Sequence, residues 1–179
     1  MKLKLALIRK AHVSPAMVTA VVEDVLPIST SWGNKCVIVL NVNHVPEPED
    51  MDTRMHNGLH PSMMKTFCHG PHFDNVIKQA VDNMKDATSK GITSFVFICI
   101  DKLGRYAALT LGKSLAEIAL ADKFLALQNI MTLNQNTDLE CGPCDQCNFW
   151  DRRFVVKNRA VAIMIDKWND HVRGPLETQ

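Results

Sequence analysis

Residues 95–100 form a continuous apolar run that is followed by a charged break and then by a helical pattern. The run, Phe-Val-Phe-Ile-Cys-Ile, is rich in β-branched and aromatic residues, as is typical of a strand buried on both faces. Residues 101–104 interrupt it with Asp, Lys, Leu and Gly. From Arg105 onward, apolar positions recur at helical spacing, at Ala108, Leu111, Leu115 and Ile118. The pattern predicts a strand–loop–helix unit whose loop can bind an anion at the helix N-terminus.

The rest of the chain repeats strand and helix patterns around this unit. Strands are predicted over 3–7, 36–42 and 125–133, and helices over 14–27, 73–91 and 151–171. The inward face of the last helix is expected to carry Val155, Val156, Ala160, Ile163, Met164 and Trp168. This order predicts an α/β fold, with a small, mostly parallel sheet and helices on both faces. Residues 1–179 are expected to form a single domain.

Residues 43–72 follow neither pattern. This stretch holds several prolines and glycines and five of the seven histidines, at 44, 56, 60, 69 and 72. It is too long for a passive connection, so we expect a structured functional loop. Its histidines suit metal ligation or phosphate contacts, although a partly exposed loop histidine without a ligand is the plainer interpretation.

Composition narrows the class of protein. A net charge of +1, a pI near 7.7 and 22% charged residues give no basic field for nucleic acid, so RNA binding would need a local patch. No signal-like or membrane-spanning run is expected from the sequence. Six cysteines without a signal favour reduced thiols and a cytoplasmic location.

Cys99 and Arg105 flank the predicted loop with the spacing Cys-x5-Arg. In that arrangement backbone amides surround an anion and the guanidinium grips it, and both the helix dipole and Arg105 would lower the pKa of a thiol placed there. The alternative is a small buried Cys99 beside a solvated Arg105.

A second chemical signal lies near the C-terminus. Cys141, Cys144 and Cys147 fall in a C-x2-C-x2-C knuckle broken by Gly-Pro, a spacing that suits zinc more than an iron–sulfur cluster. Unligated loop cysteines are the alternative. A fourth ligand would have to come through space, from Cys68, His69 or His72.

Four ordered motifs, within residues 28–120, resemble the C-terminal domain of the RNase adapter protein RapZ. They are residues 31–35 (Ser-Trp-Gly-Asn-Lys), 41–48 (Asn-Val-Asn-His-Val-Pro-Glu-Pro), Arg54 with 57–60 (Asn-Gly-Leu-His), and 99–106 (Cys-Ile-Asp-Lys-Leu-Gly-Arg-Tyr). The cysteine knuckle at 141–147 and the last helix lie outside the matched region. The family's N-terminal nucleotide-binding domain is absent from this sequence.

The resemblance implies a binding and regulatory domain that recognises a phosphosugar or RNA phosphate, and not a catalyst. It also implies a homo-oligomer. The ligand contacts carried over by motif are Ser31, Lys35, Asn43, Arg54, Asp101, Lys102, Gly104 and Arg105.

This sequence departs from the family's pattern at both strand ends. The family's Asp and Arg after the first strand are Asn41 and Asn43 here, and its His and Ser in the last motif are Gly104 and Tyr106. An acidic Asp101 in the loop would repel phosphate, and Lys102 offsets it.

The residues also allow two other functions. One is a cysteine-dependent phosphatase, with Cys99 as nucleophile, Arg105 as phosphate clamp and a carboxylate such as Asp101 or Asp50 as acid. Tyr106 argues against it, because phosphatase loops follow the arginine with Ser or Thr. The other is a zinc-stapled interaction module built on the cysteine knuckle.

Overall fold

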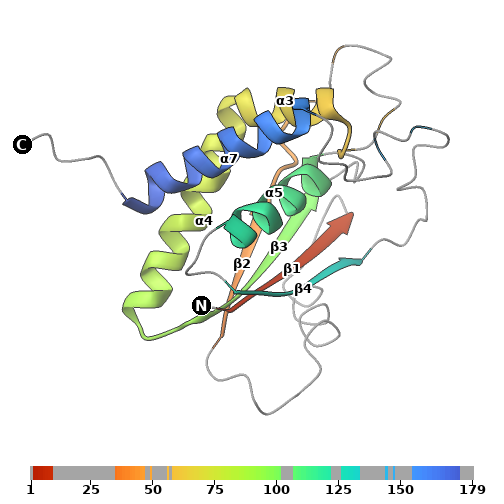
Figure 1. The fold of residues 1–179 in the computed structure, drawn as a ribbon. Helices are drawn as coiled ribbons and strands as arrows, with labels where there is room; N and C mark the ends of the chain where they lie inside the picture. Colours follow the sequence, from red (N-terminus) through yellow and green to blue (C-terminus); the bar gives the residue numbers. More distant parts are fainter. Residues whose placement is uncertain are drawn as a thin grey trace, which may run out of the picture.

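The fold combines one parallel sheet with helices stacked on it (Figure 1). The computed structural model describes residues 2–9, 35–46, 49, 56, 58–101, 107–121, 126–133, 144, 147 and 155–173. The strands are β1 (Lys2–Arg9), β2 (Lys35–Asn41), β3 (Ser94–Asp101) and β4 (Ala126–Leu133). The helices are α3 (Pro61–His69), α4 (Pro71–Ser89), α5 (Ala107–Ala121) and α7 (Val155–Arg173).

Within the described residues, the strands form one four-stranded sheet in the order β2-β3-β1-β4. All three strand pairs are parallel. Each strand lies within about two residues of its predicted position. The α/β class and the parallel sheet are therefore confirmed.

The central strand β3 is buried along its whole length. Phe95, Phe97 and Cys99 point into the core shared with the helices, whereas Val96 and Ile98 lie outside that cluster and are equally buried. Because successive strand residues point to opposite faces, both faces of β3 are covered. A continuous apolar run is the pattern expected of such a strand.

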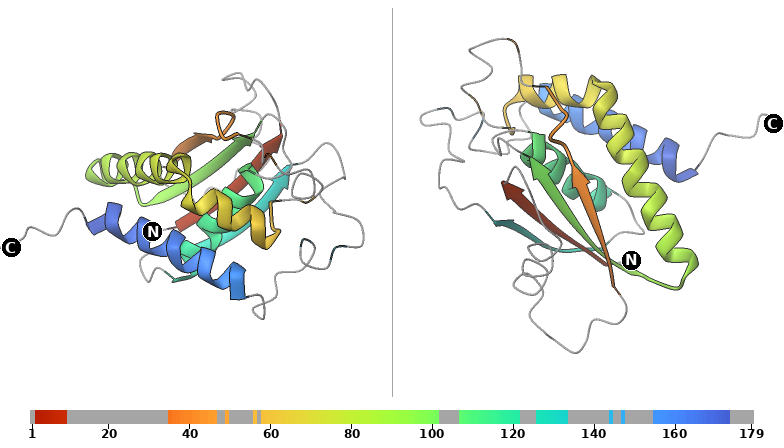
Figure 2. Two further views of the ribbon diagram at one scale, coloured as in Figure 1. Left: turned by 90° about the horizontal axis from the view of Figure 1, so that it is seen from above. Right: turned by 180° about the vertical axis from the view of Figure 1, so that it is seen from behind.

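The described helices lie on one face of the sheet in two layers (Figure 2). Helix α4 packs on β2, and α5 packs on β1, β3 and β4. Helix α7 crosses above them and contacts α3, α4 and α5. The helix predicted over 14–27 lies outside the described residues. Helices are therefore confirmed on one face of the sheet, and helices on the other face stay a prediction.

Helix α4 begins and ends where its sequence predicts. Pro71 occupies its first turn, and Gly91 follows its C-terminal cap with a φ of 77°. The Gly91 N–H donates to the Thr88 carbonyl at 2.9 Å, and the Ile92 N–H donates to that of Ala87 at 3.0 Å. These bonds satisfy carbonyls of the last turn, and glycine adopts positive φ without steric cost.

Helix α3 corrects the prediction of a loop over 43–72. His60 caps the helix, because its Nδ1 accepts the Ser62 N–H at 3.3 Å, and Pro61 opens the first turn. The buried apolar positions are Met63, Met64, Phe67 and Cys68. Their spacing is helical, so the signal was present within a histidine-rich and proline-rich stretch.

Helix α7 confirms the predicted last helix but not its whole inward face. Ala160, Met164 and Trp168 are buried as expected. Val155 and Val156, which were expected to face inward, are 58% and 42% exposed. Lys157 is 0% exposed in their place, so the first turn of α7 is rotated relative to the prediction. No helix in the described part of the chain is both long and apolar enough to span a membrane.

Candidate metal centre

The carboxyl edge of the sheet has the topology of a ligand site. The connection after β1 leads to β2 at one edge, and the connection after β3 leads to β4 at the other, although β1 and β3 are neighbours. Open α/β sheets bind ligands outside the carboxyl ends of their strands. The predicted anion loop follows β3 at this point, but residues 102–106 lie outside the described residues.

The predicted ligand contacts do not all meet there. Asp101 ends β3 and is buried, whereas Lys35 begins β2 and pairs with Ser94 at the opposite end of β3. At about 3.3 Å per residue the two ends of β3 are roughly 23 Å apart, so the structure does not bring Lys35 to Asp101. Ser31, Arg54, Lys102, Gly104 and Arg105 lie outside the described residues.

Asn43 follows β2 at the carboxyl edge. Its backbone N–H donates a hydrogen bond to Asn41 Oδ1 at 2.9 Å. Its side-chain Oδ1 is buried and has no hydrogen-bond partner among the described residues. A buried acceptor without a partner is uncommon in folded proteins, so Asn43 stays a candidate contact for a ligand at this edge.

Cys99 does not have the environment of a nucleophile. Its thiol is fully buried on the helix-facing side of β3. Burial raises its pKa above the usual range of thiols, which is opposite to the lowered pKa expected from the sequence. The structure therefore favours the interpretation of Cys99 as a small core residue over the phosphatase alternative.

Cys99 is expected to resist alkylation in the folded protein. With iodoacetamide at about pH 8, near the ordinary thiol pKa, it should react fully only after denaturation, as peptide mass spectrometry can measure. Cys36, a partly exposed cysteine on β2, serves as the comparison and should react first. Equal labelling rates for Cys99 in native and denatured protein would contradict its burial.

The structure brings histidine and cysteine side chains together between the starts of α3 and α7. Ligand atoms of His56, His60 and Cys144 all lie within 4.8 Å of one another. Cys147 Sγ lies 3.3 Å from His56 Nδ1 and is buried. Two chain segments separated by 91 residues therefore contribute to one cluster.

Local backbone structure positions each pair of side chains. The Cys147 N–H donates to the Cys144 carbonyl at 3.1 Å, which makes a tight turn of the C-x2-C segment. On the other side, the rings of His56 and His60 stack, with centroids 3.9 Å apart and an interplanar angle of 12°. The H-x3-H and C-x2-C spacings are both those of structural zinc sites.

His60 is held as a neutral imidazole. Burial, together with the charges of the neighbouring His56 and Lys157, lowers its pKa from 6.5 to about 4. A neutral imidazole has one nitrogen lone pair available, and His60 uses Nδ1 to cap α3. A metal bound at its Nε2 would require the ring proton to move to Nδ1. The protonated Nδ1 could no longer accept the Ser62 N–H, so metal binding would replace the capping hydrogen bond with a metal–ligand bond.

The cluster agrees with part of the predicted metal site. Cys144 and Cys147 lie close together as predicted, and Cys141 lies outside the described residues. Of the suggested fourth ligands, Cys68 is buried and its thiol donates to the Lys65 carbonyl at 3.3 Å. The other two, His69 and His72, are also not in the cluster, and the histidines that lie beside the cysteines are His56 and His60. The signal that could have found them is the H-x3-H spacing in the histidine-rich stretch.

Comparisons with protein-family models, with curated proteins and with solved structures found no match. The resemblance to RapZ, and the anion or RNA binding and homo-oligomer that it implies, therefore stay predictions.

Proposed function

We propose that this protein is a zinc-binding α/β domain in which one zinc ion joins the start of α3 to the chain that precedes α7. Its ligands are His56, His60, Cys144 and Cys147. The observation that carries the proposal is the convergence of an H-x3-H pair and a C-x2-C pair from segments 91 residues apart. Both spacings are those of structural zinc sites, in which metal binding stabilises the folded state.

The donor set favours zinc over other common metal ions. Two thiolates and two imidazoles are soft or borderline ligands, which suit zinc, whereas magnesium and calcium prefer oxygen. Tetrahedral zinc with bonds of about 2.0–2.3 Å places its donor atoms about 3.3–3.8 Å apart. The 3.3 Å between Cys147 Sγ and His56 Nδ1 is close to that separation. The ligand atoms of His56, His60 and Cys144 lie within 4.8 Å of one another, so small movements would bring them to it.

Four protein ligands make a structural site. Catalytic zinc sites keep a position open for water or substrate, and a Cys2His2 set leaves none. The expected effect is mechanical, because α3 and α7 pack against each other and the metal would fix their starts. We therefore infer that the protein is a binding module whose fold is stabilised by a bound metal ion.

Zinc content tests the proposal. Wild-type protein purified without chelator is expected to contain one zinc per chain by elemental mass spectrometry. Cys144→Ser and His56→Ala should each lose most of it, because removal of a ligand weakens a structural site sharply. Cys36→Ser, with a cysteine on β2 away from the cluster, is the matched control and should keep its zinc.

A fourth variant, Cys141→Ser, separates the two possible ligand sets. It should retain zinc if the ligands are two histidines and two cysteines, and lose it if the three-cysteine knuckle binds the metal. Zinc retained in His56→Ala and lost in Cys141→Ser would contradict the proposed ligands.

A further inference from the structure

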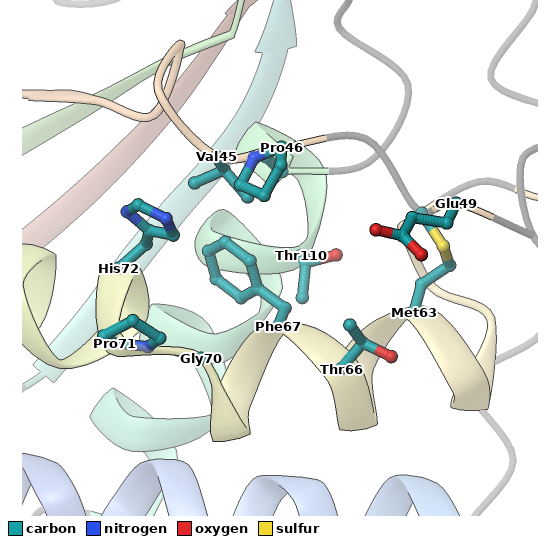
Figure 3. Close-up of a pocket in the computed structure, with 11 residues that line it drawn as sticks. Val45, Pro46, Glu49, Met63, Thr66, Phe67, Gly70, Pro71, His72 and Thr110 are labelled. Carbon is teal, nitrogen blue, oxygen red and sulfur yellow. The ribbon is translucent and has the colours of Figure 1, made fainter.

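A pocket lies beside α3, on the carboxyl side of the sheet (Figure 3). It has a volume of about 390 Å³, within the range of about 300–1,000 Å³ that is usual for small-molecule sites. The chain after β2, the α3–α4 junction and the first turn of α5 form its walls. Each of the three segments lies at the carboxyl end of a strand or in the connection that follows it, where α/β sheets bind ligands.

The walls of the pocket are mainly apolar. Phe67 lies at the centre, with Val45 and Pro46 on one side and Met63 on another (Figure 3). The Thr110 hydroxyl is already used, because it donates to the Gly58 carbonyl at 2.6 Å. An occupant must therefore have an apolar body, and Phe67 offers it an aromatic surface.

Among the described residues that line the pocket, Glu49 is the charged group that faces this apolar space. The Glu49 carboxylate points toward the pocket from the side opposite His72 (Figure 3). Glu49 forms no ion pair with any lysine, arginine or histidine among the described residues. A carboxylate at the rim of an apolar pocket attracts a cation, and the cation gains further from a nearby aromatic ring.

We infer that this pocket binds a small organic cation, with an apolar ring as its body and a protonated amine that pairs with Glu49. The ring lies against Phe67 and the amine at the rim. This binding goes beyond the proposed zinc site, since none of the four zinc ligands lines the pocket. The two proposals share only α3, which carries His60 at its start and Phe67 further along.

Binding of three related probes to the full chain tests the inference. Phenethylamine, phenethyl alcohol and hydrocinnamate share a benzene ring and differ in the charge of the head group. By calorimetry or ligand-observed NMR, phenethylamine is expected to bind saturably, the alcohol more weakly and the carboxylate most weakly. Equal affinity for amine and carboxylate, or no saturable binding of any probe, would overturn the inference.

Three variants locate the binding. Glu49→Gln should weaken phenethylamine by roughly fivefold, as expected for a partly exposed ion pair, and leave the alcohol unchanged. Thr66→Trp places a large ring at the pocket from an exposed helix position and should abolish binding of both. Asp86→Asn on α4 removes an exposed carboxylate away from the pocket and should change neither.

Unchanged phenethylamine affinity in Glu49→Gln would overturn the cation assignment, and unchanged affinity in Thr66→Trp would overturn the pocket. The same titrations on zinc-free protein separate the two proposals. Loss of zinc binding in the cluster variants is read from metal content and not from these probes, so either proposal can fail alone.

Discussion

Chelation of the metal is expected to lower the thermal unfolding midpoint by about 8–16 °C. A ligand present at a thousand times its Kd stabilises the native state by about 4 kcal/mol. For a domain of this length each kcal/mol shifts the midpoint by about 2–4 °C. The proposed zinc ion lies between α3 and α7, so its loss should loosen the upper helical layer. Scanning calorimetry before and after treatment with EDTA measures the shift.

Two variants make the chelation result specific. Cys144→Ser should begin with the lowered midpoint and show no further change with EDTA. Cys36→Ser should respond as the wild type does, and added zinc should restore the midpoint in these two proteins but not in Cys144→Ser. A midpoint in wild-type protein that EDTA leaves unchanged would contradict a stabilising metal.

Replacement of Trp168 is expected to have an effect of similar size. Trp168→Ala should destabilise the protein by about 3–5 kcal/mol, the usual cost of truncating a buried aromatic side chain. Trp168 is 2% exposed and belongs to the core cluster that α7 shares with α3, α4 and α5. Its removal leaves a cavity that the surrounding helices can fill only in part. Urea denaturation, with the slope held common between the two proteins, gives the difference.

Val172→Ala is the matched control on the same helix. Val172 is 41% exposed, so its truncation should change the free energy of unfolding by less than about 0.5 kcal/mol. If Trp168→Ala cost no more than Val172→Ala, α7 would not pack on the core through this face.

The sheet and two of its helices could be predicted because each carries a complete local pattern. The buried run of β3 has no polar residue to interrupt it, and parallel strands covered on both faces have that composition. In α4, Pro71 and Gly91 mark both ends and the buried positions recur at helical spacing between them. α5 kept its predicted buried face, Ala108, Leu111, Leu115 and Ile118.

Two features were missed because packing decides them. The start of α7 presents Val155 and Val156 to solvent and buries Lys157, which reverses the usual preference of these residue types. Lys157 lies close enough to His60 to lower its pKa. The buried lysine at the start of α7 is therefore near the histidine and cysteine cluster. Helix α3 was missed because a histidine, an uncommon cap, supplies its N-cap acceptor.

The two cysteines of the candidate metal site could be predicted from the sequence, and the two histidines could not. The C-x2-C spacing identifies Cys144 and Cys147 in the sequence. The histidines beside them are far away along the chain, with 91 residues separating His56 from Cys147. Which of five histidines in residues 43–72 reaches the cysteines depends on how α3 packs against α7, and no local pattern contains that information. Once α3 is known to begin at Pro61, His56 and His60 lie immediately before and at its cap.

X-ray absorption at the zinc edge of the purified protein reports the identity and number of the atoms that bind the metal. We expect two sulfur ligands at about 2.3 Å and two nitrogen ligands at about 2.0 Å. A site with three sulfur ligands, or with oxygen and nitrogen ligands alone, would contradict the assignment of His56, His60, Cys144 and Cys147.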